Sequence, residues 1–276
     1  MPSRPPAPRP HPGRHGPRSL RATALLGVLV LGGLPPLQPP LSLPFVAAPA
    51  MAPPAAATGA GVATVSTGNW SGYVATSAGG AFSGVTGRFD VPWARHAPAG
   101  STVSQWVGVD GWDSSTLVQA GVDVVAQAHA GALVEPWWEV VPGPQHLATG
   151  VMARPGDLVA VTLSRSGPEA WSIALTDESR QESFSTTVAY TGPASSAEWV
   201  VEAVATATGQ VTRLAPYSPA VTFSDLGLAG AQGQVTRVVM AQSGSTVSAP
   251  SALGAGGFAV TYSRPVPAPA PVPPTA

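Results

Sequence analysis

The sequence contains no cysteine and no lysine. Without cysteine the chain can form no disulfide, no thiolate nucleophile and no cysteine-ligated zinc or iron–sulfur site. Without lysine it cannot form a Schiff base with a carbonyl substrate. Charged residues make up only 10% of the 276 residues, whereas hydrophobic residues make up 44%. This composition excludes a coiled coil and a charge-rich disordered protein, and it is sufficient for a sizeable core.

Positive charge is scarce and is concentrated at the N-terminus. Five of the 13 arginines lie within the first 21 residues, and the first acidic residue is Asp90. From residue 51 onward, 8 arginines oppose 14 acidic residues, which gives a formal charge of −6. Because no basic cluster could follow a phosphate backbone, we expect no nucleic-acid partner.

Residues 1–50 have the pattern of a signal peptide or leader. The apolar run Ala22–Leu34 follows the arginines and ends at prolines, and Ala48–Ala50 offers a small-residue cleavage site. The run is shorter than the roughly 20 apolar residues of a transmembrane helix. We therefore predict a secreted, extracellular protein with no stable membrane insertion after leader removal. A disordered leader on a cytosolic protein is the alternative.

The rest of the chain divides by composition into three parts. Residues 51–66 are rich in Ala, Pro, Gly and Thr and form a linker or short pro-segment, and residues 265–276 form a proline-rich disordered tail. Residues 67–264 form the single folded domain. They contain short runs rich in Val, Thr, Ser and aromatic residues between Gly and Pro turns, which predict an all-β sandwich or barrel. The clearest runs are Ser104–Asp110, Leu158–Ser164, Trp171–Thr176, Ser183–Tyr190, Val235–Met240 and Gly257–Tyr262.

Strand alternation assigns the polar residues of these runs to faces. It places Trp106 and Asp110 opposite Val107 and Val109, and it separates three further sets: Gln119 with Asp123, Glu135 with Trp137 and Glu139, and Glu198 with Glu202. Carboxyl groups inside strands beside tryptophans are partly desolvated and are candidates for a functional site. The alternative is that they are solvent-exposed positions on the outside of a sheet.

Other catalytic systems find little support in the sequence. The five histidines show neither HxxxH nor HxH spacing, and no GxSxG motif is present. A histidine-dependent hydrolase or a metal site is therefore disfavoured, and we expect neither a metal nor a cofactor.

Six motifs in order along residues 67–264 resemble those of the glutamic peptidases, or eqolisins. They are Asn69–Tyr73, Trp106–Gly111, Leu117–Asp123, Pro136–Glu139 with Pro142, Ala197–Glu202 and Ser218–Phe223. The resemblance implies an antiparallel β-sandwich of two curved sheets, like that of concanavalin and other lectins. It also implies a secreted endopeptidase that hydrolyses proteins and peptides at acidic pH and is insensitive to pepstatin.

The resemblance also implies roles for individual residues. By position in the motifs, Gln119 and Glu202 are the catalytic pair. The positions of Trp106, Asp110, Trp137 and Glu139 match residues that line the cleft and support the pair, and Glu135 stands where the family commonly has Asp. Glu202 can act first as base and then as acid, while the neutral amide of Gln119 can donate to the oxyanion.

The chain departs from the fungal members of the family in three ways. It has no disulfides, no long pro-segment is visible, and Val140 and Val141 replace aromatic residues that we expect in the cleft wall. Two other functions remain open at this point. One is a non-catalytic carbohydrate- or peptide-binding sandwich. The other is a glycosidase using Glu139 and Glu202, which needs carboxyl groups about 5 to 9.5 Å apart. We expect a monomer.

Overall fold

The computed structural model describes residues 51–54, 61–77, 79–94, 96–128, 131–205 and 209–263. The leader with its Ala48–Ala50 site, part of the linker and the proline-rich tail lie outside the described residues. None of the described residues forms a helix long and apolar enough to span a bilayer. All the regular elements with assigned bounds are β-strands, which confirms the predicted all-β class.

Fifteen strands make up the described fold, and each of the six runs chosen from the sequence lies in one of them, two of the runs extending one residue beyond it. They are β1 (Ala63–Thr67), β2 (Trp70–Thr76), β3 (Phe82–Asp90), β4 (Thr102–Asp110), β5 (Leu117–Ala126), β6 (Ala132–Val141), β7 (His146–Leu147), β8 (Leu158–Gly167), β9 (Ala170–Asp177), β10 (Glu182–Ala189), β11 (Ser196–Glu202), β12 (Val221–Gly230), β13 (Gln234–Gln242), β14 (Ser245–Pro250) and β15 (Phe258–Tyr262).

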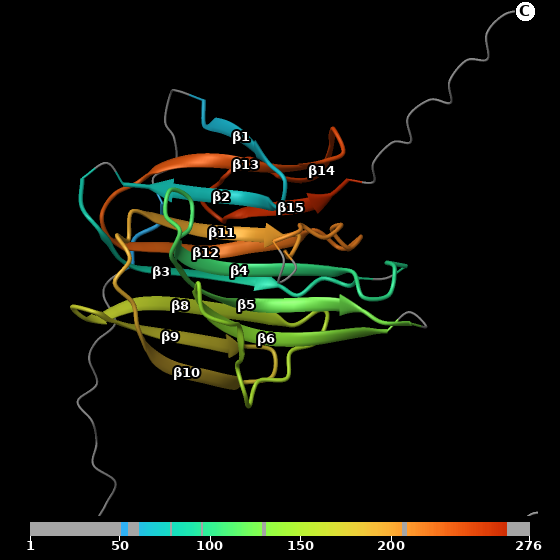
Figure 1. Cartoon of the computed structure of the whole chain (residues 1–276), viewed down its shortest axis with the longest axis horizontal. Coiled ribbons are helices and arrows are strands. Elements are labelled where there is room, and N and C mark those ends of the chain that lie inside the picture. The colour runs from blue at the N-terminus through green and yellow to red at the C-terminus, as the bar shows by residue number, and fades with distance from the viewer. Residues whose placement is uncertain are drawn as a thin grey trace, which may run out of the picture. The chain divides into compact units, whose positions relative to one another are not determined.

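The strands form two packed layers that are joined at one side (Figure 1). Hydrogen bonds run without a break through the order β10-β9-β8-β3-β12-β15-β14-β13-β2-β11-β4-β5-β6-β7. Strands far apart in this order pack on one another, including β3 on β4 and β11, and β5 on β8 and β9. The sandwich is therefore confirmed, but its two sheets are one folded sheet. β1 differs from the other strands because it pairs with β13 in parallel.

The core lies between the layers because alternate residues of each strand face it. On β9, Trp171, Ile173 and Leu175 are fully buried while the residues between them are partly exposed. The same alternation appears in Val159, Val161 and Leu163 of β8. Hydrophobic residues at period two thus account for this layer.

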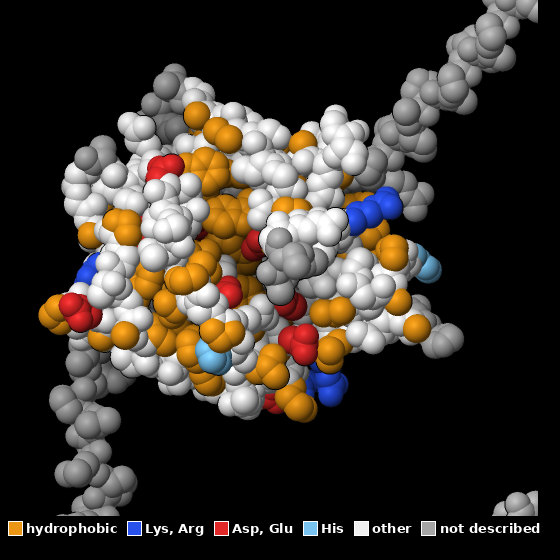
Figure 2. Space-filling view, in the orientation of Figure 1, with side chains coloured by type: hydrophobic (Ala, Val, Ile, Leu, Met, Phe, Trp, Pro, Cys, Tyr) orange, Lys and Arg blue, Asp and Glu red, His pale blue; other side chains and the backbone are white. Residues whose placement is uncertain are grey.

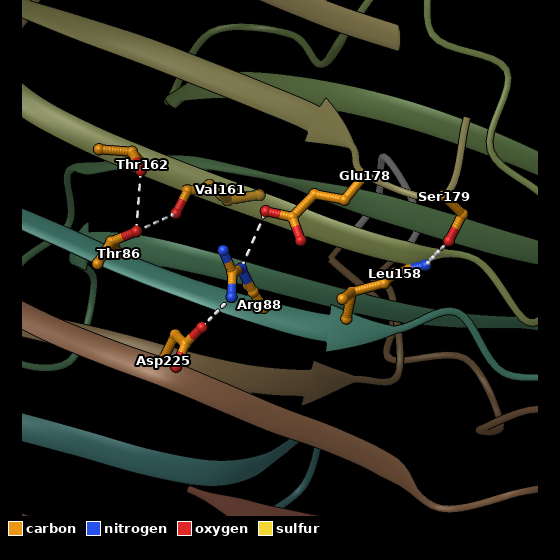
Figure 3. Close-up of polar contacts among 8 residues, drawn as sticks. All are labelled: Thr86, Arg88, Leu158, Val161, Thr162, Glu178, Ser179 and Asp225. Atoms are coloured by element: carbon orange, nitrogen blue, oxygen red, sulfur yellow. Dashed lines mark hydrogen bonds and ion pairs between the residues drawn. The ribbon is translucent and has the colours of Figure 1, made fainter. Parts of the chain in front are cut away.

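The outer face of the layer that contains β3, β8 and β9 carries polar contacts instead (Figure 3). Arg88 of β3 forms ion pairs with Glu178, at 2.9 Å, and with Asp225. Beside them the Thr86 and Thr162 hydroxyls share a hydrogen bond of 2.8 Å across β3 and β8. None of the site residues predicted from the sequence lies on this face.

β4, β5 and β11, like β2, are buried on both faces. One face packs into the main core through residues such as Val107, Val109 and Trp199. The opposite face carries a second apolar cluster of Trp106, Leu117, Trp137 and Val200, with Trp70 and Val141 against it. Strand alternation predicted this division of faces, and we call the face that carries the second cluster the cleft face.

The cleft wall corrects one expectation from the sequence. Val141 packs on the second cluster and faces the cleft, whereas Val140 packs against the main core. Adjacent strand residues point to opposite faces, so only one of the two valines can replace an aromatic residue of the wall.

Gly121 of β5 leaves room for the tryptophan side chains of the two neighbouring strands. It pairs with Trp106 on β4 and with Trp137 on β6. A Cβ atom at this position would lie 2.3 Å from the Gln105 carbonyl oxygen and 2.5 Å from the Trp106 Cβ. Glycine therefore lets two tryptophans flank one strand without a clash.

Candidate active site

The cleft face of β11, β4, β5 and β6 is organised in rows of residues that pair across the strands. One row joins Glu202, Ser104, Asp123 and Glu135, and another joins Glu198, Gly108, Gln119 and Glu139. Between them lies the row Val200, Trp106, Gly121 and Trp137. Figure 2 shows acidic side chains among hydrophobic ones over the middle of this face, with basic side chains at its margins.

Glu202 is held at the cleft by two neutral donors. The Asn69 side-chain amide donates to Oε1 at 3.0 Å, and the Trp106 indole N–H donates to Oε2 at 2.8 Å. Burial raises the pKa of Glu202 to about 7, an effect that Trp106, Trp70 and Asn69 partly offset and Asp123 reinforces. A carboxyl group with this pKa exchanges its proton in the range in which acid–base catalysts work.

Gln119 is oriented by a carboxyl group of the next strand. Its Nε2 donates to Glu139 Oε2 at 2.7 Å, and its Oε1 is buried without a hydrogen-bond partner among the described residues. One N–H of the amide therefore remains available to a bound molecule. Burial raises the pKa of Glu139, and the contact with Gln119 partly offsets this rise.

Asp123 lies in the same row as Glu202. Trp137 Nε1 donates to Asp123 Oδ1 at 2.9 Å, and Gln145 Nε2 donates to Oδ2 at 3.1 Å. Burial raises the pKa of Asp123. The hydrogen-bond donors Ser104, Gln145 and Trp137 partly offset this rise, and the negative charge of Glu135 adds to it. Asp123 also raises the pKa values of both Glu202 and Glu139, so it couples the two parts of the site electrostatically.

Asp110 is placed to support the site and not to contact substrate. It is fully buried, and its carboxylate accepts hydrogen bonds from the Tyr190 hydroxyl at 2.6 Å and from the backbone N–H groups of Ala194 and Ser195 at 2.8 Å each. These contacts attach the segment before β11 to the end of β4.

Tryptophan side chains form much of the cleft wall. Trp70 packs edge-on against Trp106 with ring centroids 5.0 Å apart, and it stacks on Trp112 at 6.4 Å. These rings lie beside Glu202, whose strand partner is Trp70. They exclude water from the carboxyl group while the indole of Trp106 still provides a hydrogen bond.

The structure thus brings together most of the residues chosen from the sequence. Trp106 contacts Glu202, Gln119 contacts Glu139, and Trp137 and Glu135 flank Asp123. No hydrogen bond joins Gln119 directly to Glu202 in the described ranges. Their rows are separated by four residues along β5, about 13 Å of strand, and β4 lies between the strands that carry them.

Sequence reasoning assigned no role to several residues that complete the site: Asn69, Trp70, Ser104, Asp123 and Gln145. Asn69, Trp70 and Asp123 stand within the six motifs and share a face or a strand with assigned residues, so a signal for them existed. Gln145 reaches Asp123 from the loop after β6, and nothing in the sequence pattern predicts that contact.

The described residues give no indication of a metal site. Among the residues that the structure places, no group of three or more His, Cys, Asp or Glu is arranged to hold a metal ion. His146, one of the histidines in this part of the chain, stacks on Trp138 at 4.4 Å.

Comparison with known proteins identifies relatives of this fold. The sequence model of the Peptidase A4 family matches residues 68–262. The structure resembles scytalido-glutamic peptidase with a transition state analogue inhibitor, at 19% identity and a TM-score of 0.63, covering 71% of this chain and 98% of that chain. A search of curated protein sequences finds no significant match.

Two further solved structures share the fold. One is SCP-B of the eqolisin family in complex with the tripeptide Ala-Ile-His, at 18% identity and a TM-score of 0.59, covering 71% of this chain and 98% of that chain. The other is aspergilloglutamic peptidase from Aspergillus niger, at 23% identity and a TM-score of 0.52, covering 59% of this chain and 99% of that chain.

Glu198 makes the stability of this layer dependent on pH. It is fully buried, and neither carboxyl oxygen has a hydrogen-bond partner of normal geometry among the described residues. Burial raises its pKa well above 4.5, an effect that Ser196 partly offsets and the charges of Asp110 and Asp113 reinforce. The folded chain therefore keeps a proton that the unfolded chain releases. The resulting stabilisation is complete below about pH 4 and is lost as the pH rises towards the folded pKa.

We predict that Glu198→Gln unfolds at higher denaturant concentration than the wild type at pH 7 and at a similar concentration at pH 3.5. The amide cannot ionise, so the loss of about 1.4 kcal/mol for each unit of pKa shift disappears. Chemical denaturation at the two pH values measures this difference, and Glu169→Gln at an exposed position is the control. Equal pH dependence of Glu198→Gln and the wild type would contradict the prediction.

Proposed function

The chain belongs to the Peptidase A4 family of glutamic peptidases, and we propose that Glu202 and Gln119 catalyse its hydrolysis of peptide bonds. Family membership makes the protein an endopeptidase that acts on proteins, and it decides against the binding module and the glycosidase. The assignment of the catalytic pair is supported by their contacts in the cleft. The contact that carries most weight is the double hydrogen bond from Asn69 and Trp106 to Glu202.

Glu202 serves as the proton shuttle. Its carboxylate takes a proton from the attacking water, and the resulting carboxylic acid then gives a proton to the leaving amine. Both steps need a carboxyl group that is fixed in place without being neutralised by a cation. The amide of Asn69 and the indole of Trp106 provide this, because neither carries a charge.

Gln119 stabilises the oxyanion. One N–H of its amide is used by Glu139, which fixes the orientation of the group, and the other can donate to the oxygen that becomes negative in the tetrahedral intermediate. An amide needs no particular protonation state for this role. The pair therefore has one titrating group, unlike two carboxyl groups that share a proton.

An acidic working range follows from two opposing effects of pH. Water activation requires ionised Glu202, so catalysis should increase as the pH rises towards about 7. The fold loses stability over the same range because the pKa values of Glu198, Asp123 and Glu202 are all raised by burial. We therefore expect the range of useful activity to lie below about pH 7.

Secretion is part of the proposal and rests on the leader at residues 1–50. Because one chain supplies every group of the site, a monomer suffices for activity. In an exporting host we expect the mature protein to begin near Met51 or later, with the arginine-rich leader removed. N-terminal sequencing of protein from the medium tests this, and a secreted form that begins before Leu34 would contradict it.

We predict that Glu202→Gln lowers kcat on a denatured protein substrate by at least about 10² to 10⁴. The variant should remain folded, since the two side chains are nearly isosteric. Gln119→Ala should lower kcat by about 10² to 10³ through loss of an oxyanion donor. Because both groups act in one transition state, the double variant should lose less than the product of the two effects.

The assay is run at acidic pH with EDTA and pepstatin present, since neither should act on this pair. Glu198→Gln is the internal control, because Glu198 lies four residues earlier on the same face of β11 and is protonated under these conditions. Near-wild-type turnover of Glu202→Gln, together with loss of activity in Glu198→Gln, would show that the catalytic glutamate is four residues earlier in the chain.

A further inference from the structure

Two glycines form the floor of a notch on the outer face of the layer that contains β3 and β12. They are Gly84 of β3 and Gly227 of β12, and the two strands pair at Thr86 and Gly227. Gly84 shares a face with Thr86, two residues along the strand. A Cβ atom on Gly227 would lie 2.8 Å from Thr86 Cγ2, so this glycine notch opens on the face that carries the Thr86 side chain (Figure 3). Both glycines are buried, so another part of the chain covers them.

Met51 fills the glycine notch. A Cβ atom on Gly84 would lie 2.6 Å from the Met51 ε-methyl carbon, and one on Gly227 would lie 2.8 Å from the Met51 Cβ. The methyl carbon is the nearest atom at Gly84, and at Gly227 Thr86 Cγ2 is equally near. Neither glycine has a positive φ, so the backbone does not itself require glycine at these positions. A side chain at either position would compete with the methionine for the same space.

The backbone after Met51 pairs with an open edge of β12. The Ala52 N–H donates to the Leu228 carbonyl oxygen at 2.7 Å, and the Leu228 N–H donates to the Ala52 carbonyl oxygen at 2.6 Å. Such a reciprocal pair is that of an antiparallel ladder. On its other side Leu228 pairs with Val85 of β3. Because β15 pairs with β12 at residues 221–223, Ala52 takes the part of this edge that β15 leaves open.

Two prolines end the pairing directly after Ala52. Proline has no N–H group, so neither Pro53 nor Pro54 can donate to a further strand. Both prolines instead line a pocket of about 460 Å³ whose wall also includes Leu226 and Leu253. Residues 51–54 thus cover an edge with which an extended chain could pair, and they are themselves unable to extend the sheet.

We propose that residues 51–54 are a clasp that the mature protein keeps, and that the leader is cut where Met51 is retained. The Ala48–Ala50 site directly precedes the clasp in the sequence. A cut after Ala50 removes the arginine-rich leader and leaves the methionine in the glycine notch. The processing step rests on the proposed secretion, and it narrows the expected start of the mature chain. The clasp itself does not rest on secretion.

The processing step is a hydrolysis catalysed by a signal-type peptidase of the exporting host. Water adds to the carbonyl carbon of Ala50, and the Ala50–Met51 peptide bond breaks. The leader keeps the carboxylate, and Met51 gains the α-amino group. Trimming past Ala52 would remove the partner of both backbone groups of Leu228 and would expose the edge of β12, which is a site for unwanted strand pairing.

The experiment measures thermal unfolding of the exported full chain as wild type, Met51→Ala, Gly84→Ala and the double variant. Met51→Ala should lower Tm by about 3 to 6 °C, the shift for loss of a partly buried methionine side chain in a domain of this size. Met152→Ala is the matched control, because Met152 is 61% exposed. Its Tm should stay within about 2 °C of that of the wild type.

The double variant tests whether Met51 occupies the glycine notch. Gly84→Ala alone forces its methyl group against Met51 and should lower Tm. In the Met51→Ala background that space is free, so the same substitution should lower Tm by less than half as much. The Leu163 carbonyl oxygen, 3.0 Å from the added Cβ, and the effect of alanine on the unfolded chain are the same in both backgrounds, so the comparison cancels them.

N-terminal sequencing of protein from the medium tests the processing step, and we expect a start at Met51 or a few residues before it. A mature chain that begins at Pro53 or later would overturn the inference. An unchanged Tm in Met51→Ala, an equal loss in Met152→Ala, or changes in Tm that simply add in the double variant would also overturn it.

Neither readout requires turnover, so failure of the proposed catalytic pair leaves both results unchanged. An exported chain with its leader intact would refute the proposed secretion and the processing step, while the unfolding measurements would still decide whether the clasp exists.

Discussion

Burial of carboxyl groups without an arginine beside them is the constraint on which this structure depends. Glu198, Glu202, Asp123 and Glu139 lie on one face of β11, β5 and β6, and burial is the largest cause of the raised pKa of each. None of the described arginines lies on these strands or on β4; the ion pairs within the described residues involve Arg88 and Arg180 on other elements. The carboxyl groups therefore hold their protons more tightly than in water, and the folded chain is suited to acid.

Neutral donors take the place of cations in the cleft. Indole N–H groups of Trp106 and Trp137 and side-chain amides of Asn69 and Gln145 fix the orientation of the carboxyl groups. An arginine at these positions would lower the pKa of Glu202 by electrostatic attraction and would make it a weaker base. The tryptophans also exclude water, so a single residue type provides both the desolvation and the hydrogen bond. Close packing of two of these rings against one strand depends on Gly121, where a side chain would clash with the backbone of β4.

The sequence predicted the faces of the strands better than it predicted their neighbours. Period-two alternation placed Trp106 opposite Val107 and Glu202 opposite Val201 because each strand has one face in the main core. It could not show that the layers are joined through β14 and β15, or that β1 pairs in parallel with β13, because strand order is set by long-range packing. Asn69 lay within a motif, but its contact with Glu202 joins residues 133 positions apart. The resemblance matched Asp110 to residues that line the cleft and support the pair, but it could not show which backbone groups Asp110 binds, namely the N–H groups of the segment before β11.

The most direct test is the titration of the Glu202 carboxyl group itself. Carbon-13 NMR of protein labelled at the glutamate carboxyl carbons, recorded from pH 3 to 9, follows the ionisation of each glutamate. The signal of Glu202 is identified by its loss in a Glu202→Gln sample. Desolvation in the cleft predicts a midpoint at about pH 7. A midpoint near 4.5, the ordinary value of a glutamate, would contradict the account, because Glu202 would then be solvated and the cleft would not control its proton.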